Sequence, residues 1–211
     1  MRVNVEDEWK AISRVVESGT RDGKPTSEVR LGRTFRTDLD DLWDALTNAE
    51  RIPQWMLPIS GELRLGGTYQ LEGNASGTIT ACDPPRSFEA TWEYAGEVSW
   101  IEVRLQVVSH TETHFELIHV SPVDEKMWDQ YGPGAVGVGW DLSLLGLSLN
   151  VSSGAAKPPE SEGWESSDEG RRFCRASSGA WAAASIAFGT EPGAARAAAD
   201  RTTAFYTGVS E

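Results

Sequence analysis

The chain has 211 residues, of which 32 are acidic and 19 are basic, so it carries a net charge of −13. This excess of negative charge repels phosphate groups, so we expect neither nucleic acid nor an anionic membrane as a partner. A chain of this length buries roughly 70% of the surface that its unfolded form exposes, which is enough for a substantial hydrophobic core.

An N-terminal extension is predicted over residues 1–27. Residues 1–8 read MRVNVEDE and lack the apolar stretch of about 7 to 15 residues that marks a secretory signal, so we expect a cytoplasmic protein. Residues 6–13 favour a short helix. Apolar residues on both sides of the turn-rich segment 19–25 predict a hairpin, whose second strand ends near residue 36.

Two short helices are predicted ahead of the main sheet. Apolar residues recur at helical spacing over residues 39–46, and Thr37 or Asp38 can accept a hydrogen bond from the first free amides. Asn48 favours the start of a second short helix, which Pro58 ends.

From Gly61 onward the apolar residues follow a period of two, as they do when side chains point alternately to the two faces of a sheet. The alternating apolar residues are Phe88, Ala90, Trp92 and Tyr94, then Ile101, Val103, Leu105 and Val107. Glycine and proline residues separate these segments at spacings typical of hairpins. We therefore predict consecutive antiparallel hairpins with one apolar face.

A loop after Pro122 leads into a long predicted helix. Its apolar stripe is formed by Val136, Trp140, Leu144, Leu147 and Val151. The stripe needs an apolar partner, and the apolar face of the sheet has a comparable size. Residues 136–151 fall short of the ~18 residues needed to cross a bilayer and include Asp141, which indicates a core helix.

A linker is predicted at residues 153–167 and a C-terminal helical extension at 168–211. Ser166 and Glu169 fit a capping box that opens the first helix of the extension. One face of that helix carries four apolar residues, Phe173, Trp181, Ala184 and Phe188. A second helix over residues 191–206 has a weak apolar face made mainly of alanines. This face indicates docking on the preceding helix or on a second copy of the chain, and both alternatives stay open.

The string GPGAVG at residues 132–137 matches the G-x-G-x-x-G pattern of dinucleotide-binding loops. Such a loop requires a buried strand before it and an acidic residue about 20 positions later. Here a polar loop precedes the string and a Ser-rich segment occupies the acidic position. We interpret the glycines as allowing other backbone to approach the start of a helix closely, and we predict no cofactor.

Few side chains have the chemistry to bind a metal or to act as nucleophiles. His110 and His114 are four residues apart, but β-branched residues between them predict a hairpin turn, so we predict no metal site. Cys82 and Cys174 lie in different sequence contexts, and we expect both to be reduced. The chain has no G-x-S-x-G motif, and we predict no catalytic residue.

Four aromatic side chains are predicted to point between the sheet and the long helix: Trp55, Tyr69, Trp92 and Trp140. They either fill the core or line a pocket of about 300 to 1,000 Å³. His119 shares the parity of Phe115 and Leu117, so it points to the apolar side of its strand. It is either a hydrogen-bonded core residue or a polar group that orients a ligand.

Six short motifs follow one another between residues 29 and 151: LWDALT at 42–47, QW at 54–55, GG at 66–67, DPP at 83–85, LIH at 117–119 and GW at 139–140. In this order they resemble the activator of Hsp90 ATPase homologue 1-like branch of the START-like (SRPBCC) superfamily. The resemblance implies an α+β helix-grip fold of the START-like, Bet v 1-like type, in which a curved antiparallel sheet wraps around a long C-terminal helix. It covers residues 28–152, to which the C-terminal helical pair is an addition.

Relatives in this superfamily bind hydrophobic small molecules between sheet and helix, and the resemblance implies that this chain binds a hydrophobic or aromatic small molecule. The predicted ligand-binding residues are Trp55, Tyr69, Ile79, Trp92, Leu105, Leu117, His119, Trp140 and Leu144. The eukaryotic activator carries a separate amino-terminal domain without a counterpart in these 211 residues, so the resemblance does not imply Hsp90 activation.

Two other functions stay open. Relatives that guide polyketide ring closure make a cyclase-like or dehydratase-like enzyme an alternative. Such an enzyme would use the same cavity and would need His119 with a further polar residue such as Tyr69. The other alternative is a regulatory or structural protein that forms a homodimer through its C-terminal helices.

Overall fold

The computed structural model describes residues 5–154, 156 and 163–208. The chain folds into two compact units. The first consists of Met1–Leu31, Val123–Leu145 and Pro158–Glu211, and the second of Gly32–Pro122 and Gly146–Lys157. One strand and the longest apolar helix contribute residues to both units.

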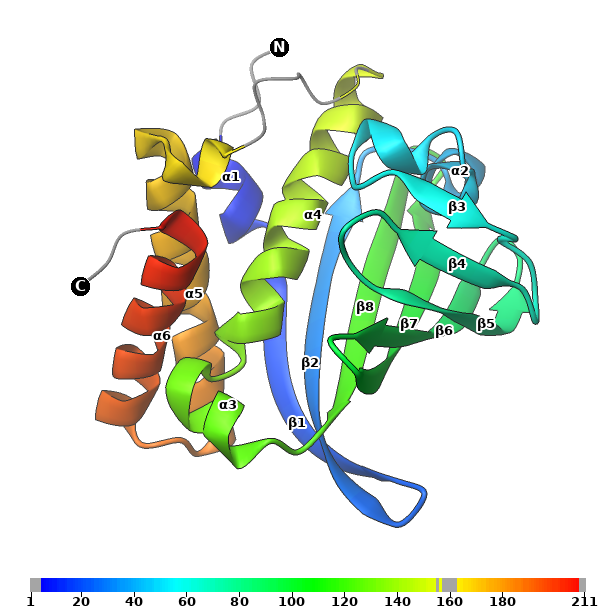
Figure 1. The fold of residues 1–211 in the computed structure, drawn as a ribbon. Coiled ribbons are helices and arrows are strands. Elements are labelled where there is room, and N and C mark those ends of the chain that lie inside the picture. The colour runs from blue at the N-terminus through cyan, green and yellow to red at the C-terminus, as the bar shows by residue number, and fades with distance from the viewer. Residues whose placement is uncertain (1–4, 155, 157–162, 209–211) are drawn as a thin grey trace. The chain divides into compact units, whose positions relative to one another are not determined.

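Eight strands form one sheet in the order β1-β2-β8-β7-β6-β5-β4-β3 (Figure 1). Their bounds are Ser13–Arg21, Lys24–Phe35, Ile59–Gly61, Thr68–Leu71, Ser76–Asp83, Ser87–Tyr94, Glu97–Ser109 and Glu112–Pro122 for β1 to β8. The strands β3 to β8 pair antiparallel in chain order, which confirms the predicted meander. The predicted α+β, helix-grip fold class is also confirmed.

The register sends one row of side chains from β6, β7 and β8 to the same face of the sheet. Trp92 is opposite Ser99, and Ile101 is opposite both Ala90 and His119. Directly opposed residues of antiparallel strands share a face, so the predicted alternation is confirmed. The buried apolar residues of this face include Ala90, Ile101, Val103, Leu105, Phe115 and Leu117.

The strand ends depart from the predicted pattern. Tyr94 and Val107 have the apolar parity but are 56% and 55% exposed, because both lie close to a hairpin turn. The turn between β1 and β2 is narrower than predicted. β1 continues to Arg21, and the turn consists of Asp22 and Gly23, both with positive φ.

Of the two short helices predicted in the second unit, one is a full helix and the other a single turn. α2, Leu39–Thr47, begins as predicted, because the Asp38 carboxylate accepts a hydrogen bond of 2.9 Å from the Asp41 amide. The second is only the 3₁₀ turn η1, Ile52–Gln54. Asn48 therefore caps a tight turn rather than a helix of several turns.

The first unit contains α1, Val5–Lys10, and a helix that the sequence does not predict. α3, Glu125–Tyr131, lies where we predicted a loop. The Asp124 carboxylate caps it by accepting hydrogen bonds from the amides of Lys126 and Met127, at 2.9 and 3.0 Å. None of its residues is buried, so the segment lacks the apolar stripe by which a helix is recognised.

The predicted long helix is α4, Gly134–Ser153, and it is longer than its apolar segment suggests. With 20 residues it could cross a membrane by length and composition, so the length argument was wrong. However, 56% of its most apolar window is buried inside the protein. Asp141 lies near its middle, is completely buried and forms an ion pair with Arg14. Because more than half of this window and the charge of Asp141 are buried inside the protein, α4 is a core helix.

Two helices form the C-terminal part of the first unit and run side by side (Figure 1). They are α5, Asp168–Phe188, and α6, Pro192–Thr207. α5 starts one residue later than the predicted capping box, because Ser167 and not Ser166 accepts the hydrogen bond from the backbone, at 3.1 Å. α6 docks on α5 and buries Ala195, Ala198, Thr202 and Thr207.

The predicted linker at 153–167 is described only in part. Residues 155 and 157–162 lie outside the described residues, and the 3₁₀ turn η3, Trp164–Ser166, immediately precedes α5. The predicted domain bounds remain predictions.

The glycines at the start of α4 let side chains from α5 and α6 reach its backbone. A Cβ atom on Gly137 would stand 2.2 Å from the Trp181 ring, and one on Gly134 would stand 3.1 Å from Thr202. The close neighbours are thus side chains and not the backbone that we predicted. α3 precedes the string 132–137 where a dinucleotide-binding loop needs a buried strand.

Candidate functional site

A polar pair lies beside a tryptophan on the apolar face of β6 to β8. The rings of Trp92 and His119 meet edge to face, with their centroids 6.0 Å apart. The His119 Nε2 atom is 2.8 Å from the Ser99 Oγ atom, and the Ser99 hydroxyl donates a hydrogen bond of 3.0 Å to the Trp92 carbonyl. Because the serine proton is used in this way, the geometry favours the imidazole tautomer that donates from Nε2.

Burial decides the protonation state of His119. The side chain is 4% exposed, and desolvation lowers its pKa to about 4. The imidazole is therefore neutral at pH 7. A neutral, hydrogen-bonded ring is compatible with both roles that the sequence left open, a core residue and a polar group facing a ligand.

Because of His119, the free energy of unfolding should fall by about 2 kcal/mol between pH 7 and pH 5. The unfolded chain takes up a proton near the ordinary pKa of 6.5, whereas the folded protein keeps this ring neutral down to about pH 4. The unfolded state therefore binds more protons in this interval. Urea denaturation of the wild type and of His119→Gln at both pH values measures the difference, and equal losses in the two proteins would contradict the prediction.

The Tyr69 hydroxyl forms a hydrogen bond within the sheet. Tyr69 lies on β4, is buried, and donates a hydrogen bond of 2.7 Å to the Thr91 carbonyl on β6. Its ring passes over Gly77 of β5, where a Cβ atom would stand 2.8 Å from it. Burial raises the pKa of this phenol, and the charge of Glu93 adds to the rise. His119 lies on β8, and β5, β6 and β7 stand between β4 and β8 in the order of the sheet.

Trp55 is held as a packed core residue. It is 8% exposed, and its Nε1 atom donates a hydrogen bond of 2.9 Å to the Ala45 carbonyl of α2. Its own carbonyl lies against Gly146, where a Cβ atom would stand only 2.3 Å away. The hydrogen bond fixes the orientation of the indole, and the close contact is made by the backbone of Trp55.

The remaining predicted site residues divide between the two units. Register and parity place Ile79, Leu105 and Leu117 on the same face as Trp92 and His119. Leu105 and Leu117 are buried, whereas Ile79 and Trp92 are half-buried and keep accessible surface. The two predicted residues of the first unit, on the first part of α4, are both buried: Trp140 and Leu144.

Sequence reasoning missed Ser99, which holds the His119 ring. The signal was present, because Ser99 has the same parity on its strand as Ile101 and therefore shares the apolar face.

The two histidines considered for a metal site, His110 and His114, are not part of this group. His110 lies in the turn between β7 and β8, and His114 lies on β8 within 3.3 Å of the Thr34 hydroxyl.

A buried charge cluster lies in the first unit. The Asp141 Oδ2 atom accepts hydrogen bonds from Arg14 Nε at 2.9 Å, from Trp181 Nε1 at 3.1 Å and from the Ser177 hydroxyl. Burial raises the pKa of the Asp141 carboxyl, while the charge of Arg14 and the three donors oppose the rise. Arg14 also donates to two backbone carbonyls near α1, so the cluster joins α1, β1, α4 and α5.

Comparison with known proteins gives one family match. The family model for Activator of Hsp90 ATPase homolog 1-like protein matches residues 25–149. No curated protein matches the chain. Among solved structures, the crystal structure of CalU16 from Micromonospora echinospora is 31% identical, with a TM-score of 0.65 over 82% of this chain and 98% of CalU16. Its solution NMR structure is 30% identical, with a TM-score of 0.71 over 84% and 96%.

Two more distant structures share the fold alone. An HSP90 activator from Plasmodium falciparum is 19% identical, with a TM-score of 0.51 over 62% of this chain and 99% of that chain. DynU16, from the dynemicin biosynthetic locus, is 16% identical, with a TM-score of 0.55 over 61% of this chain and 48% of that chain.

Proposed function

Because the chain belongs to the Activator of Hsp90 ATPase homolog 1-like family, we propose that it binds a hydrophobic or aromatic small molecule against the apolar face of its sheet. One observation carries the proposal. The half-buried Trp92 adjoins the buried, neutral His119 and its half-buried partner Ser99 on a face that is otherwise apolar. Apolar surroundings with a few placed polar groups are typical of small-molecule sites.

In this proposal Trp92 and Ile79 supply the accessible contact surface, and Leu105 and Leu117 form the buried floor beneath a ligand. The His119 and Ser99 pair offers the polar group that orients it. Tyr69 and Trp55 shape the surroundings through their fixed rings, since their polar atoms are already hydrogen bonded. Contacts of the ligand with two further residues stay predictions: Trp140 and Leu144.

Two features support binding over a cyclase-like or dehydratase-like reaction. The Tyr69 hydroxyl is donated to the Thr91 carbonyl, so it is not free to donate a proton to a substrate. A histidine with a pKa of about 4 is a weak base at neutral pH, where general base catalysis works best with a pKa near the operating pH.

Replacing Trp92 with alanine should weaken the binding of the uncharged dye Nile red at least tenfold, or about 1.4 kcal/mol. Trp100→Ala is the matched control, because Trp100 is also half-buried and lies on the neighbouring strand with its side chain on the opposite face. It should leave the affinity unchanged. A fluorescence titration of both variants tests the proposal, and equal affinities in the two would exclude a site at Trp92.

We propose that the protein is cytoplasmic and that it works without a cofactor. Both of its cysteines, Cys82 and Cys174, are free thiols. A homodimer through the C-terminal helices is supported by Phe205 of α6, which is 66% exposed. Sedimentation equilibrium of the intact chain and of Phe205→Ser distinguishes this dimer from a monomer.

A further inference from the structure

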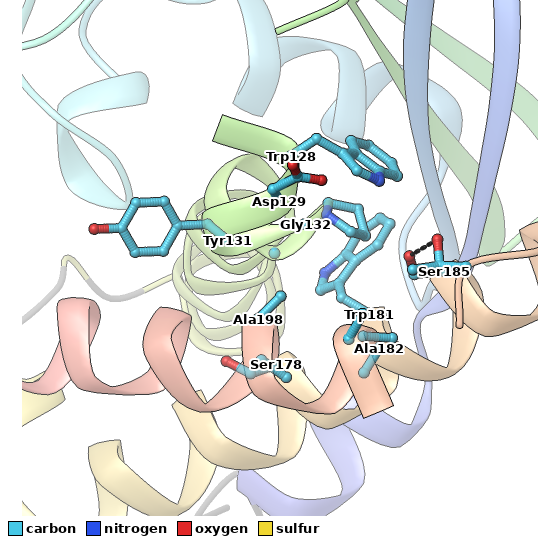
Figure 2. Close-up of a pocket in the computed structure, with 15 residues that line it drawn as sticks. Trp128, Asp129, Tyr131, Gly132, Ser178, Trp181, Ala182, Ser185 and Ala198 are labelled. Carbon is cyan, nitrogen blue, oxygen red and sulfur yellow. Dashed lines mark hydrogen bonds between the residues drawn. The ribbon is translucent and has the colours of Figure 1, made fainter. Parts of the chain in front are cut away.

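The first unit contains a cavity of about 260 Å³ that is separate from the residues of the proposed function (Figure 2). It lies where the end of α3 and the start of α4 face α5 and α6. None of the nine predicted ligand-binding residues lines it.

Two tryptophans form its aromatic walls, and both rings are held in place. Trp181 of α5 is completely buried, and its Nε1 atom donates to Asp141, so its ring carbons are left to face the cavity. Trp128 of α3 is half-buried and packs edge to face on Phe188, with the centroids 6.3 Å apart. Figure 2 shows the two indoles close to each other on neighbouring sides of the space.

The space exists because α6 presents side chains that end at Cβ. The alanines of α6 that line the cavity are Ala194, Ala195, Ala198 and Ala199. The alanine run that gives α6 its weak apolar face therefore also leaves room between α3 and α6. Any longer apolar side chain on this side of the helix would occupy part of that room.

A buried hydroxyl at the cavity wall points to a ligand. Ser178 of α5 lines the cavity and is 2% exposed, and its Oγ atom has no hydrogen-bond partner among the described residues. A buried polar atom without a partner is costly, and a ligand group that hydrogen bonds to it removes that cost. The other buried hydroxyl on the wall is already satisfied, because Ser185 donates to Thr190 at 2.8 Å.

We propose that this cavity is a second ligand site, which takes an uncharged bicyclic aromatic molecule with one hydrogen-bonding group. The volume of about 260 Å³ lies just below the range of about 300 to 1,000 Å³ that is typical of pockets for drug-sized ligands, so a small bicyclic molecule such as indole suits it better than a larger one. The flat ring lies against the two tryptophans, and its polar group reaches Ser178. Asp129 is the charged residue on the lining and is exposed, so it disfavours an anionic ligand.

Titration of the intact protein with 5-fluoroindole, followed by ¹⁹F NMR, tests the proposal. Saturable binding is expected, with a Kd of about 1 mM or below for a molecule of this size. Ala199→Leu should weaken binding at least tenfold by filling the cavity. Ala197→Leu is the matched control on the same helix, because Ala197 does not line the cavity, and it should leave the Kd unchanged.

Two further variants separate this site from the sheet. Ser178→Ala should weaken binding several-fold without altering the fold, and it keeps the test available if Ala199→Leu does not fold. Trp92→Ala should remove only a separate signal of probe bound at the sheet, whereas the bound signal that Ala199→Leu weakens should keep its Kd in Trp92→Ala, since Trp92 does not line the cavity. Replacing the probe with anionic 5-fluoroindole-2-carboxylate should weaken binding. Binding that does not saturate, that is equal in Ala199→Leu and Ala197→Leu, or whose Ala199→Leu-sensitive signal is lost in Trp92→Ala would overturn the proposal.

Discussion

Replacing Gly137 with alanine should lower the free energy of unfolding by about 3 kcal/mol, although alanine is the better helix former. The added Cβ atom would stand 2.2, 2.4 and 2.6 Å from three atoms of the Trp181 ring. Trp181 cannot move aside cheaply, because it is completely buried and its Nε1 atom is hydrogen bonded to Asp141. Urea denaturation measures the loss.

Gly179→Ala is the matched control for this prediction. Gly179 lies within α5, and a Cβ atom on it would meet nothing within 4 Å. The same substitution should there raise the free energy of unfolding by about 0.5 to 1 kcal/mol, through helix propensity alone. If both variants raise the free energy of unfolding, or both lower it, the contact with Trp181 does not restrict which residue fits at position 137.

The strands were predictable because their pattern is local and repeats. Apolar residues alternate with polar ones over residues 88–94 and 101–107, and this alternation alone fixes which side chains share a face. His119 was assigned to the apolar face in this way, and the register places it opposite Ile101. The same reasoning, applied to Ser99, would have identified the hydrogen-bond partner of the imidazole.

Features that depend on partners far away in the chain were not predictable. The sequence marks Asp141 only as a charge that interrupts an apolar helix, and its partner Arg14 lies 127 residues earlier. The cavity of the first unit draws its walls from α3, the start of α4, α5 and α6, and α3 has no buried residue of its own. The glycines of α4 indicated close packing correctly, but only the structure identifies Trp181 as the neighbour.

Local capping signals were informative to within one residue. Asp38 caps α2 as predicted, whereas Ser167 takes the role predicted for its neighbour Ser166. Adjacent serines offer the same hydroxyl chemistry, so the choice between them depends on the backbone path into α5. That path is set by η3, whose Ser166 donates a hydrogen bond to the Thr207 carbonyl at the end of α6.

Arg14→Met should be among the most damaging single substitutions, with a loss of about 3 to 5 kcal/mol in the free energy of unfolding at pH 7. The side chains of Arg14 and Asp141 are 5% and 0% exposed, so removing the guanidinium leaves a carboxylate buried without its counter-charge. Chemical denaturation at neutral pH measures the loss. Lys10→Met is the control, because the Lys10 and Glu6 side chains are 55% and 71% exposed. Its loss should stay below about 0.5 kcal/mol.

The pH dependence of this loss distinguishes a buried charge from lost packing. Burial already raises the pKa of Asp141, and without Arg14 one of the interactions that oppose the rise is gone. The folded variant would then bind a proton more readily than its unfolded chain does. Protonation removes the buried charge, so the destabilisation by Arg14→Met should shrink between pH 7 and pH 5. A loss of constant size over this interval would mean that Arg14 contributes through packing and backbone hydrogen bonds, not by balancing the charge of Asp141.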